Sequence, residues 1–158
     1  MAVTTLKMGS EAWWQSKKGP EWEREDNGNY RVTFWWRDPQ GTEKESAIHR
    51  VWVYITGVTD HHQNATPQSM QRIDGTNVWC WRVSLSANWR GSYCFIPTTR
   101  NDIFSSLAVG AAPDRSVLRE GWRQLLPQAI ADPLNPQSWQ GGRGHAVSAL
   151  EMPEAPVQ

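Results

Sequence analysis

Few residues of the chain stand in patterns that could perform covalent chemistry. A serine hydrolase built on an α/β sheet carries its nucleophile on a sharp strand–turn–helix, usually within a G-x-S-x-G motif. No serine of this sequence has that setting, since Ser92 follows Gly91 but lies inside a predicted strand. Phosphate-binding glycine loops, CxxC pairs and the HExxH motif are also absent from the sequence. We therefore assign the chain no catalytic residue, no cofactor-binding residue and no metal ligand.

The adjacent histidines His61 and His62, which follow Asp60, are the candidates for a ligand-contacting loop. Neighbouring side chains of an extended segment point to opposite sides, so they rarely bind one metal ion without a third ligand nearby. A solvated loop is the favoured interpretation. A loop that contacts a ligand is the alternative, and a structural metal site is the least favoured of the three.

Tryptophan is the residue type whose abundance bears most directly on function. The chain has eleven tryptophans among its 158 residues, and a core needs only a few. Exposed aromatic rings commonly stack on ligands or partners, so we expect some of these rings at the surface. Sixteen basic residues balance sixteen acidic ones. Such a balance produces no overall field that attracts nucleic acid or an anionic membrane, and we expect neither as a partner.

The N-terminal sequence and the two cysteines favour a cytoplasmic protein. The first residues lack the apolar run of a signal peptide, and no stretch is long and apolar enough to cross a membrane. Cys80 and Cys94 lie on two strands that we expect to pair, so a cross-strand disulfide is conceivable. Without an export signal, two reduced and packed thiols are the favoured interpretation.

The stretch from 77 to 97 is the predicted centre of the fold. Apolar and polar residues alternate over 79–85 and again over 93–95, with the period of two that is typical of a half-buried strand. Asn88 and Gly91 mark a turn between these two segments. The pattern predicts a hairpin at the centre of an antiparallel sheet.

Two further strands and a short helix precede this hairpin. Residues 30–36 alternate cleanly, whereas 48–56 is apolar on both faces. We expect the second strand to be central, covered by another sheet on one side and by a helix or second domain on the other. Ser10 is a suitable N-cap for the helix. Because this helix is so short, we expect only one of Trp13 and Trp14 to face inward.

The C-terminal third is predicted to contain one helix followed by a connector. Leu118, Trp122 and Leu125 share a stripe at helical spacing within 114–126. The stretch 132–158 is rich in proline and glycine, so we interpret it as a linker. The residues by themselves therefore predict a mainly β fold, a small β-sandwich with one or two short flanking helices and a C-terminal linker.

Five tryptophan-rich or otherwise distinctive blocks resemble the N-terminal domain of the enterochelin (enterobactin) esterase family. They are VTFWWRDPQG, HRVWVYITGVTDHHQN, NWRGSYCFIPT, LREGWRQLLPQAIADPLN and GHAVSALEMPEAP. The resemblance implies an immunoglobulin-like, early-set β-sandwich over 1–131. It also implies that the linker, 132–158, leads toward an α/β-hydrolase domain that this chain does not contain.

The resemblance further implies an activity for the parent protein. In that family the hydrolase domain carries Ser-His-Asp/Glu machinery that cleaves the triserine lactone of ferric enterobactin in the cytoplasm and lets iron be released. No catalytic residue carries over to a position of this chain, so we expect the chain alone to be inactive. Iron enters only as part of the siderophore substrate, and no cofactor is implied.

Four residues are candidates for contact with that substrate. Ferric enterobactin is trianionic and has three catecholate rings, which tryptophan can stack on and arginine can attract. Turns project from the end of a sandwich, so we select Trp89, Arg90, His61 and His62 as part of a wall or lid of the esterase cleft. The alternative is that these residues only pack against the hydrolase domain.

Two other classes of function remain open at this point. Aromatic-rich sandwiches also bind sugar rings, which would make the chain a carbohydrate-binding module. A domain of this kind can also be purely structural and fix the orientation or the oligomeric state of its partner.

Overall fold

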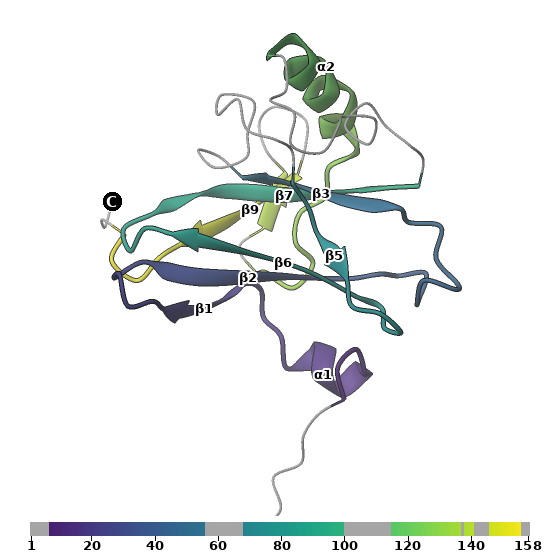
Figure 1. Ribbon diagram of the computed structural model, residues 1–158, viewed down its shortest axis with the longest axis horizontal. Helices are drawn as coiled ribbons and strands as arrows, with labels where there is room; N and C mark the ends of the chain where they lie inside the picture. The colour runs from purple at the N-terminus through teal and green to yellow at the C-terminus, as the bar shows by residue number, and fades with distance from the viewer. Residues whose placement is uncertain (1–6, 56–67, 100–114, 137, 141–145, 156–158) are drawn as a thin grey trace, which may run out of the picture.

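Two antiparallel β-sheets packed face to face form the body of the protein (Figure 1). The computed structural model describes residues 7–55, 68–99, 115–136, 138–140 and 146–155. The first sheet has the strand order β1-β2-β6-β5 and the second has the order β4-β3-β7-β9-β8. The predicted β-sandwich with short flanking helices is confirmed, whereas its assignment as immunoglobulin-like and early-set stays a prediction. The strands are β1 Glu21–Arg24, β2 Tyr30–Arg37, β3 Arg50–Ile55, β4 Gln68–Ser69, β5 Gln71–Arg72, β6 Val78–Leu85, β7 Arg90–Thr98, β8 Ser138–Gln140 and β9 Ala146–Glu151.

The main core lies between the two sheets. Alternate residues of β2 and β6, such as Phe34 and Trp79, face Val53 of β3 and Phe95 of β7. None of these four side chains is more than 5% exposed. Phe34 packs edge-on against Tyr93 with ring centroids 5.0 Å apart, a preferred geometry for aromatic pairs. The predicted inward faces of these strands are confirmed.

The predicted pairing of the central hairpin is wrong. β6 pairs with β2 and β5, whereas β7 pairs with β3 and β9. The turn between them therefore carries the chain from one sheet to the other. A period of two shows which face of a strand is buried but not which strand lies beside it. Since Cys80 and Cys94 lie in different sheets and both are free, the conceivable disulfide is excluded and the favoured reduced thiols are confirmed.

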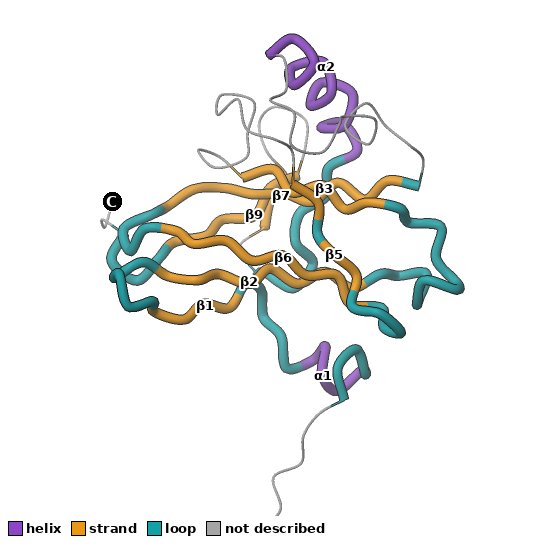
Figure 2. Tube along the Cα trace, viewed as in Figure 1, coloured by secondary structure: helices purple, strands orange, loops and turns teal. Residues whose placement is uncertain are grey.

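Helix α1 (Glu11–Gln15) covers the outer face of the first sheet (Figure 2). Its predicted N-cap is confirmed, because the Ser10 hydroxyl accepts a hydrogen bond from the N–H of Trp13. The expectation that one tryptophan would face solvent is wrong, since Trp13 and Trp14 are 8% and 3% exposed. Trp13 packs edge-on against Trp35 at 5.2 Å, and Trp14 donates its indole N–H to Asn77. Trp35 lies on the outer face of β2, opposite to the face that packs in the main core, and its ring is covered there by α1.

Helix α2 (Arg115–Leu125) covers the outer face of the second sheet (Figure 1). Its stripe packs on Trp52 of β3 and Ile96 of β7. This layer explains why β3 is apolar on both faces, as the sequence indicated. A short 3₁₀ helix, η2 (Leu126–Gln128), follows where Pro127 ends the regular helix.

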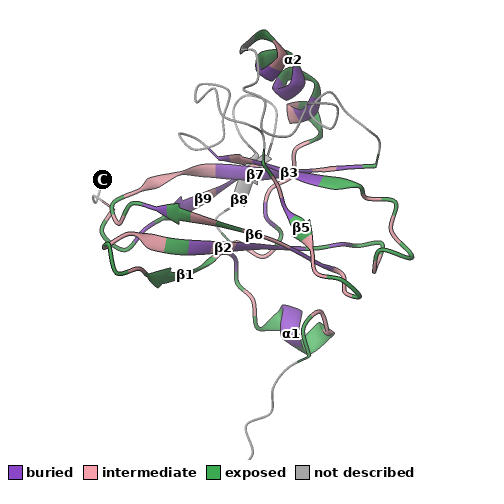
Figure 3. Ribbon diagram, in the orientation of Figure 1, coloured by how far each residue is buried: buried purple, intermediate pink, exposed green. Residues whose placement is uncertain are grey.

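The predicted linker, 132–158, is corrected by the structure, because it contains β8 and β9. β9 pairs with β7 and contributes Ser148 and Leu150 to the buried interior (Figure 3). The sequence signal was weak because β9 consists largely of small residues and finds its partner more than fifty positions earlier in the chain. The domain boundary placed at 131 therefore divides the second sheet.

A buried polar network anchors this C-terminal segment to β7. The Tyr93 hydroxyl donates to Asp132 over 2.7 Å, and Asn135 donates to the same hydroxyl over 3.1 Å. The N–H of Asp132 donates to the Ser148 hydroxyl of β9. Buried polar groups are tolerated when they are hydrogen-bonded, so this network can hold the segment in the interior.

Candidate functional site

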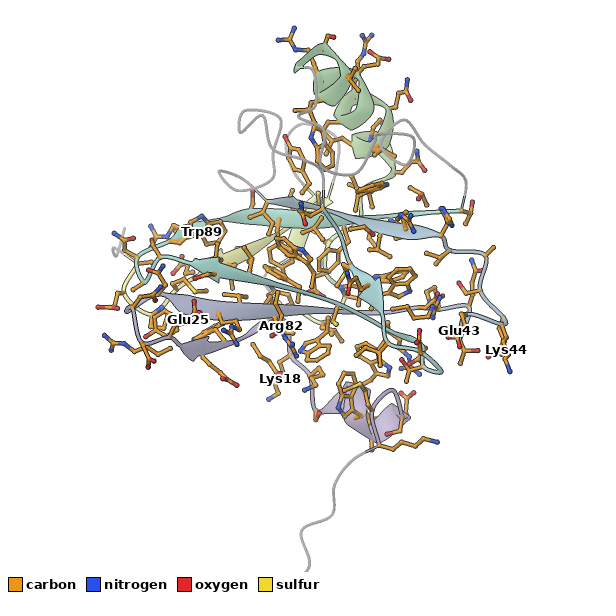
Figure 4. The ribbon with its side chains drawn as sticks, in the orientation of Figure 1. Lys18, Glu25, Glu43, Lys44, Arg82 and Trp89 are labelled. Carbon is orange, nitrogen blue, oxygen red and sulfur yellow. The ribbon has the colours of Figure 1, made fainter. Side chains whose placement is uncertain are left out.

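Three segments meet at one end of the sandwich, which we call the exit end. They are 25–29 between β1 and β2, 86–89 between β6 and β7, and 152–155 after β9. The N–H of Met152 donates to the carbonyl of Trp89 over 2.9 Å, and the N–H of Glu154 donates to that of Ala87 over 3.0 Å. Trp89 and Glu25 are labelled at this end in Figure 4. Two of the four candidate residues, Trp89 and Arg90, therefore lie beside the last described residues.

The Trp89 ring packs closely against Gly91 and the main core instead of projecting from its turn. A side-chain Cβ built on Gly91 would come within 2.7 Å of this ring, so only glycine leaves room for it. The ring is half-buried and packs against the main core. In this arrangement Trp89 covers the end of the core between the sheets.

Arg90 is held by an ion pair across the second sheet. It lies directly opposite Glu151 of β9, with Nε and Oε1 3.1 Å apart. The two side chains are 25% and 56% exposed, and ion pairs at such positions contribute little to stability. The other two candidates, His61 and His62, lie outside the described residues.

The hollow at the exit end carries mixed charge. It has a volume of about 380 Å³ and is lined by Glu23, Arg24, Glu25, Asp26, Asn27 and Arg31. Three carboxylates thus face two guanidinium groups. Glu25 accepts a hydrogen bond from Ser84 and pairs with Arg31 at 3.5 Å. A hollow with this balance has no excess of positive charge with which to hold an anion.

No activated cysteine is present in the described part of the chain. Burial raises the pKa of the Cys94 thiol to about 12 and also raises that of Cys80, so neither is a thiolate near neutral pH. Within the same residues, no three His, Cys, Asp or Glu side chains are grouped to hold a metal ion. None of the described helices is long and apolar enough to span a bilayer.

Trp22 of β1 is the surface residue that the sequence interpretation missed. Its side chain is 41% exposed, and Met8 is the other large hydrophobic residue exposed among those described. Seven of the ten tryptophans whose burial the structure describes are buried, so the expectation of exposed rings holds clearly for Trp22. The available signal was a lone aromatic within a run of charged residues, Glu21-Trp22-Glu23-Arg24.

The described residues define the class of two-sheet antiparallel β-sandwiches, a fold that does not by itself fix a function. The chain belongs to the family described as Enterochelin esterase, N-terminal, whose model matches residues 31–158. This finding agrees with the resemblance carried by the sequence blocks.

Curated relatives carry the name Iron(III) enterobactin esterase. The chain is 73% identical over 156 residues to the one from Escherichia coli (strain K12), and this match covers 99% of the chain but 38% of that relative. It is 46% identical over 160 residues to the one from Dickeya dadantii, with 99% and 36% covered. The chain thus spans well under half the length of these relatives.

Solved structures of similar proteins have the same fold. The ferric enterobactin esterase of Salmonella typhimurium matches with a TM-score of 0.90 and 77% identity, over 94% of this chain and 38% of that one. The enterobactin esterase of Shigella flexneri, solved in the presence of enterobactin, matches with a TM-score of 0.85 and 70% identity, over 97% and 37%.

Proposed function

We propose that this chain is the N-terminal accessory domain of a cytoplasmic esterase that hydrolyses ferric enterobactin and thereby allows iron to be released. The observation that carries the proposal is 73% identity over 99% of the chain to a protein named Iron(III) enterobactin esterase. The nucleophile and its base belong to an α/β-hydrolase domain that follows in the parent protein. Iron takes part only as a component of the substrate, without a resident cofactor and without nucleic acid or a membrane as partner.

The role of the sandwich itself is to support the hydrolase domain and to contribute a wall of its cleft. Trp89 and Arg90 lie beside the last described residues, at the end from which a following domain would begin. Trp89 lies against Gly91 and Arg90 is paired with Glu151. These contacts favour a packing role over direct capture of a trianionic ligand. Contact of His61, His62, Trp89 and Arg90 with substrate stays a prediction.

The esterase assignment is tested by a fusion protein. The chain is joined to the downstream residues of its Escherichia coli relative, and hydrolysis of ferric enterobactin is followed by the release of dihydroxybenzoylserine. We expect the fusion to hydrolyse the substrate in a serine-dependent manner and the 158-residue chain to be inactive. Hydrolysis by the chain alone would contradict the assignment of the catalytic groups.

The substrate-wall role is tested by Trp89→Ala and Arg90→Ala in the same fusion. Loss of a substrate contact is expected to raise KM with thermal stability unchanged, whereas loss of packing lowers stability with KM unchanged. Glu151→Gln is the matched control for Arg90→Ala, because it breaks the same ion pair without removing the guanidinium.

A carbohydrate-binding module is the weaker alternative. Such modules present aromatic rings to solvent, but in the described residues Trp22 is the one tryptophan classed as exposed. Binding of the chain to an insoluble polysaccharide, together with no saturable quenching by ferric enterobactin, would support it.

A further inference from the structure

In the part of the chain that the structure describes, one edge of the sandwich is open. β1 is the edge strand of the first sheet, and Ala149–Glu151 form the nearby edge of the second, since β8 pairs only with residues 146–148 of β9. At the opposite edge Met70 joins β4 to β5 and so links the two sheets. The open edge contains a groove of about 330 Å³.

Trp22 stands in this groove. It lies opposite Val32, whose side chain is in the main core, so Trp22 is on the inward face of the first sheet but at its uncovered edge. Pro20 and Trp22 form one wall of the groove, and Pro136, Ala149 and Leu150 form the other. An exposed tryptophan between prolines and aliphatic groups is typical of an interface anchor.

We propose that this groove is the docking surface for the polypeptide that follows the equivalent of Gln158 in the relatives, with Trp22 as its anchor. The inference rests on the proposed function and names the surface through which the accessory domain supports its partner. The chain covers 38% of the Escherichia coli relative, so most of that protein lies outside this fold.

The path of the chain supports this occupant. The groove is lined by the end of β9, and only residues 152–155 separate that strand from the last described position. These residues turn to the exit end, where they pair with 87–89. The last described residues therefore lie close to the strand that lines the groove, and a domain that follows in the relatives can reach the groove without a long connection.

The rim of the groove indicates which chemistry the partner surface presents. Lys18 is exposed at the groove, is labelled in Figure 4, and has no ion-pair partner among the described residues. Glu151 already pairs with Arg90. The complementary surface is therefore an apolar centre for Trp22 with a carboxylate placed to meet Lys18, an arrangement of apolar core and polar rim.

The proposal is tested by oxidative labelling with hydroxyl radicals, read by mass spectrometry at single residues. The 158-residue chain is compared with its fusion to the downstream residues of the Escherichia coli relative. We expect oxidation of Trp22 to fall several-fold in the fusion. Met8, which is 39% exposed and does not line the groove, is the matched control and is expected to be oxidised equally in both proteins.

A variant gives a second, independent readout. Trp22→Ala is expected to lower the thermal midpoint of the fusion while leaving that of the 158-residue chain unchanged, because the ring is exposed in the latter. Met8→Ala is expected to leave the thermal midpoints of both proteins unchanged. Equal oxidation of Trp22 in both proteins, or an equal effect of Trp22→Ala on both, would overturn the proposal.

Other outcomes separate the competing explanations. Protection of Trp22 in the 158-residue chain that disappears on dilution would overturn the proposal in favour of contact between two copies. A fusion that hydrolyses ferric enterobactin with Trp22 still exposed refutes the docking surface and leaves the proposed function intact. A fusion that protects Trp22 but fails to hydrolyse the substrate refutes the function and supports the docking surface.

Discussion

Asp38 and Arg72 form a deeply buried ion pair, with side chains 0% and 9% exposed and Nη2 and Oδ2 2.6 Å apart. Arg72 also donates to the carbonyls of Gly41 and Thr76, and its guanidinium lies 4.8 Å from the centre of the Trp79 ring. Burial alone would raise the pKa of Asp38, but hydrogen bonds from Ser46, the Gln40 N–H, Arg72 and Trp79 outweigh it and lower that pKa. The pair ties the turn after β2 to β5.

Asp38→Asn is expected to lower the free energy of unfolding by about 3–5 kcal/mol at neutral pH, because it leaves Arg72 buried without its counter-ion. Because the pKa of Asp38 is lower in the folded state than in the unfolded chain, its carboxylate stabilises the protein at pH values above the unfolded-state pKa. This stabilisation is lost as pH falls through the folded-state pKa. The variant should therefore lose less stability on acidification than the parent. Urea unfolding at neutral pH and at about pH 3, below the usual pKa of aspartate, measures both effects.

Glu11→Gln is the control for this prediction. It breaks the ion pair between Glu11 and Arg37, whose side chains are 66% and 42% exposed, and ion pairs at such exposed positions contribute little to stability. Equal losses of stability in the two variants would contradict the buried role of Asp38.

Tyr93→Phe is expected to lower the free energy of unfolding by about 1–3 kcal/mol, because it removes the buried hydroxyl that donates to Asp132 and accepts from Asn135. Burial raises the pKa of Asp132, and the Tyr93 hydroxyl and the Leu134 N–H partly oppose this. Removing the hydroxyl raises that pKa further. A carboxyl group whose pKa is higher in the folded state than in the unfolded chain destabilises the protein as pH rises above the unfolded-state pKa. The variant should therefore lose more stability, relative to the parent, at neutral pH than at about pH 4.

Urea unfolding at the two pH values tests this expectation. Tyr30→Phe serves as the control, because Tyr30 is only half-buried at the start of β2. If Tyr93→Phe lowers the free energy of unfolding equally at both pH values, the loss comes from packing and not from the hydroxyl.

At the scale of elements, β9 changes the role of the whole C-terminal segment. Its ladder with β7 extends over four residue pairs, from Arg90 with Glu151 to Tyr93 with Ser148. Leu150 fills the core, and the same strand forms one wall of the open groove. A segment with the composition of a linker is therefore part of both the core and the proposed docking surface.

Leu150→Ala is expected to lower the free energy of unfolding by about 2–5 kcal/mol, the usual cost of a cavity in a packed core. Glu154→Ala, an exposed position four residues later, should stay within about 0.5 kcal/mol of the parent. Chemical unfolding of the 158-residue chain measures both. Equal free energies of unfolding for the two variants would support the interpretation of 132–158 as a linker.

At the scale of the whole molecule, the protein is layered (Figures 1 and 2). Helix α1 covers the outer face of the first sheet, the main core lies between the two sheets, and helix α2 covers the outer face of the second sheet. The chain passes from one sheet to the other between β2 and β3, between β4 and β5 and between β6 and β7. This arrangement keeps Cys80 and Cys94 in separate sheets.

Both thiols are therefore expected to react with an alkylating reagent in the unfolded chain. A reductant should leave the thermal midpoint of the 158-residue chain unchanged. In the folded chain Cys94 should resist alkylation, because it is fully buried and its pKa is raised to about 12. Mass spectrometry after alkylation under native and denaturing conditions checks this. An intact mass two hydrogens below that of the dithiol form would contradict it.

Local pattern determined many of the elements of this protein, but not β8 and β9. The alternation in β2, β6 and β7, the Ser10 cap and the stripe of α2 are properties of neighbouring residues, and these predictions are confirmed. Trp89 lies in the predicted turn, whereas Arg90, which was placed in the same turn, is the first residue of β7. The ion-pair partner of Arg90 was not predictable from such patterns, because Glu151 lies 61 positions later in the chain.

Tertiary structure decided everything that depends on which segments lie side by side. It assigned β6 and β7 to different sheets, buried both Trp13 and Trp14, and brought β9 into the core. It also left Trp22 at an open edge. The physical reason is that a strand's period fixes its buried face, whereas its neighbours are selected by the fit of side chains contributed by distant parts of the chain.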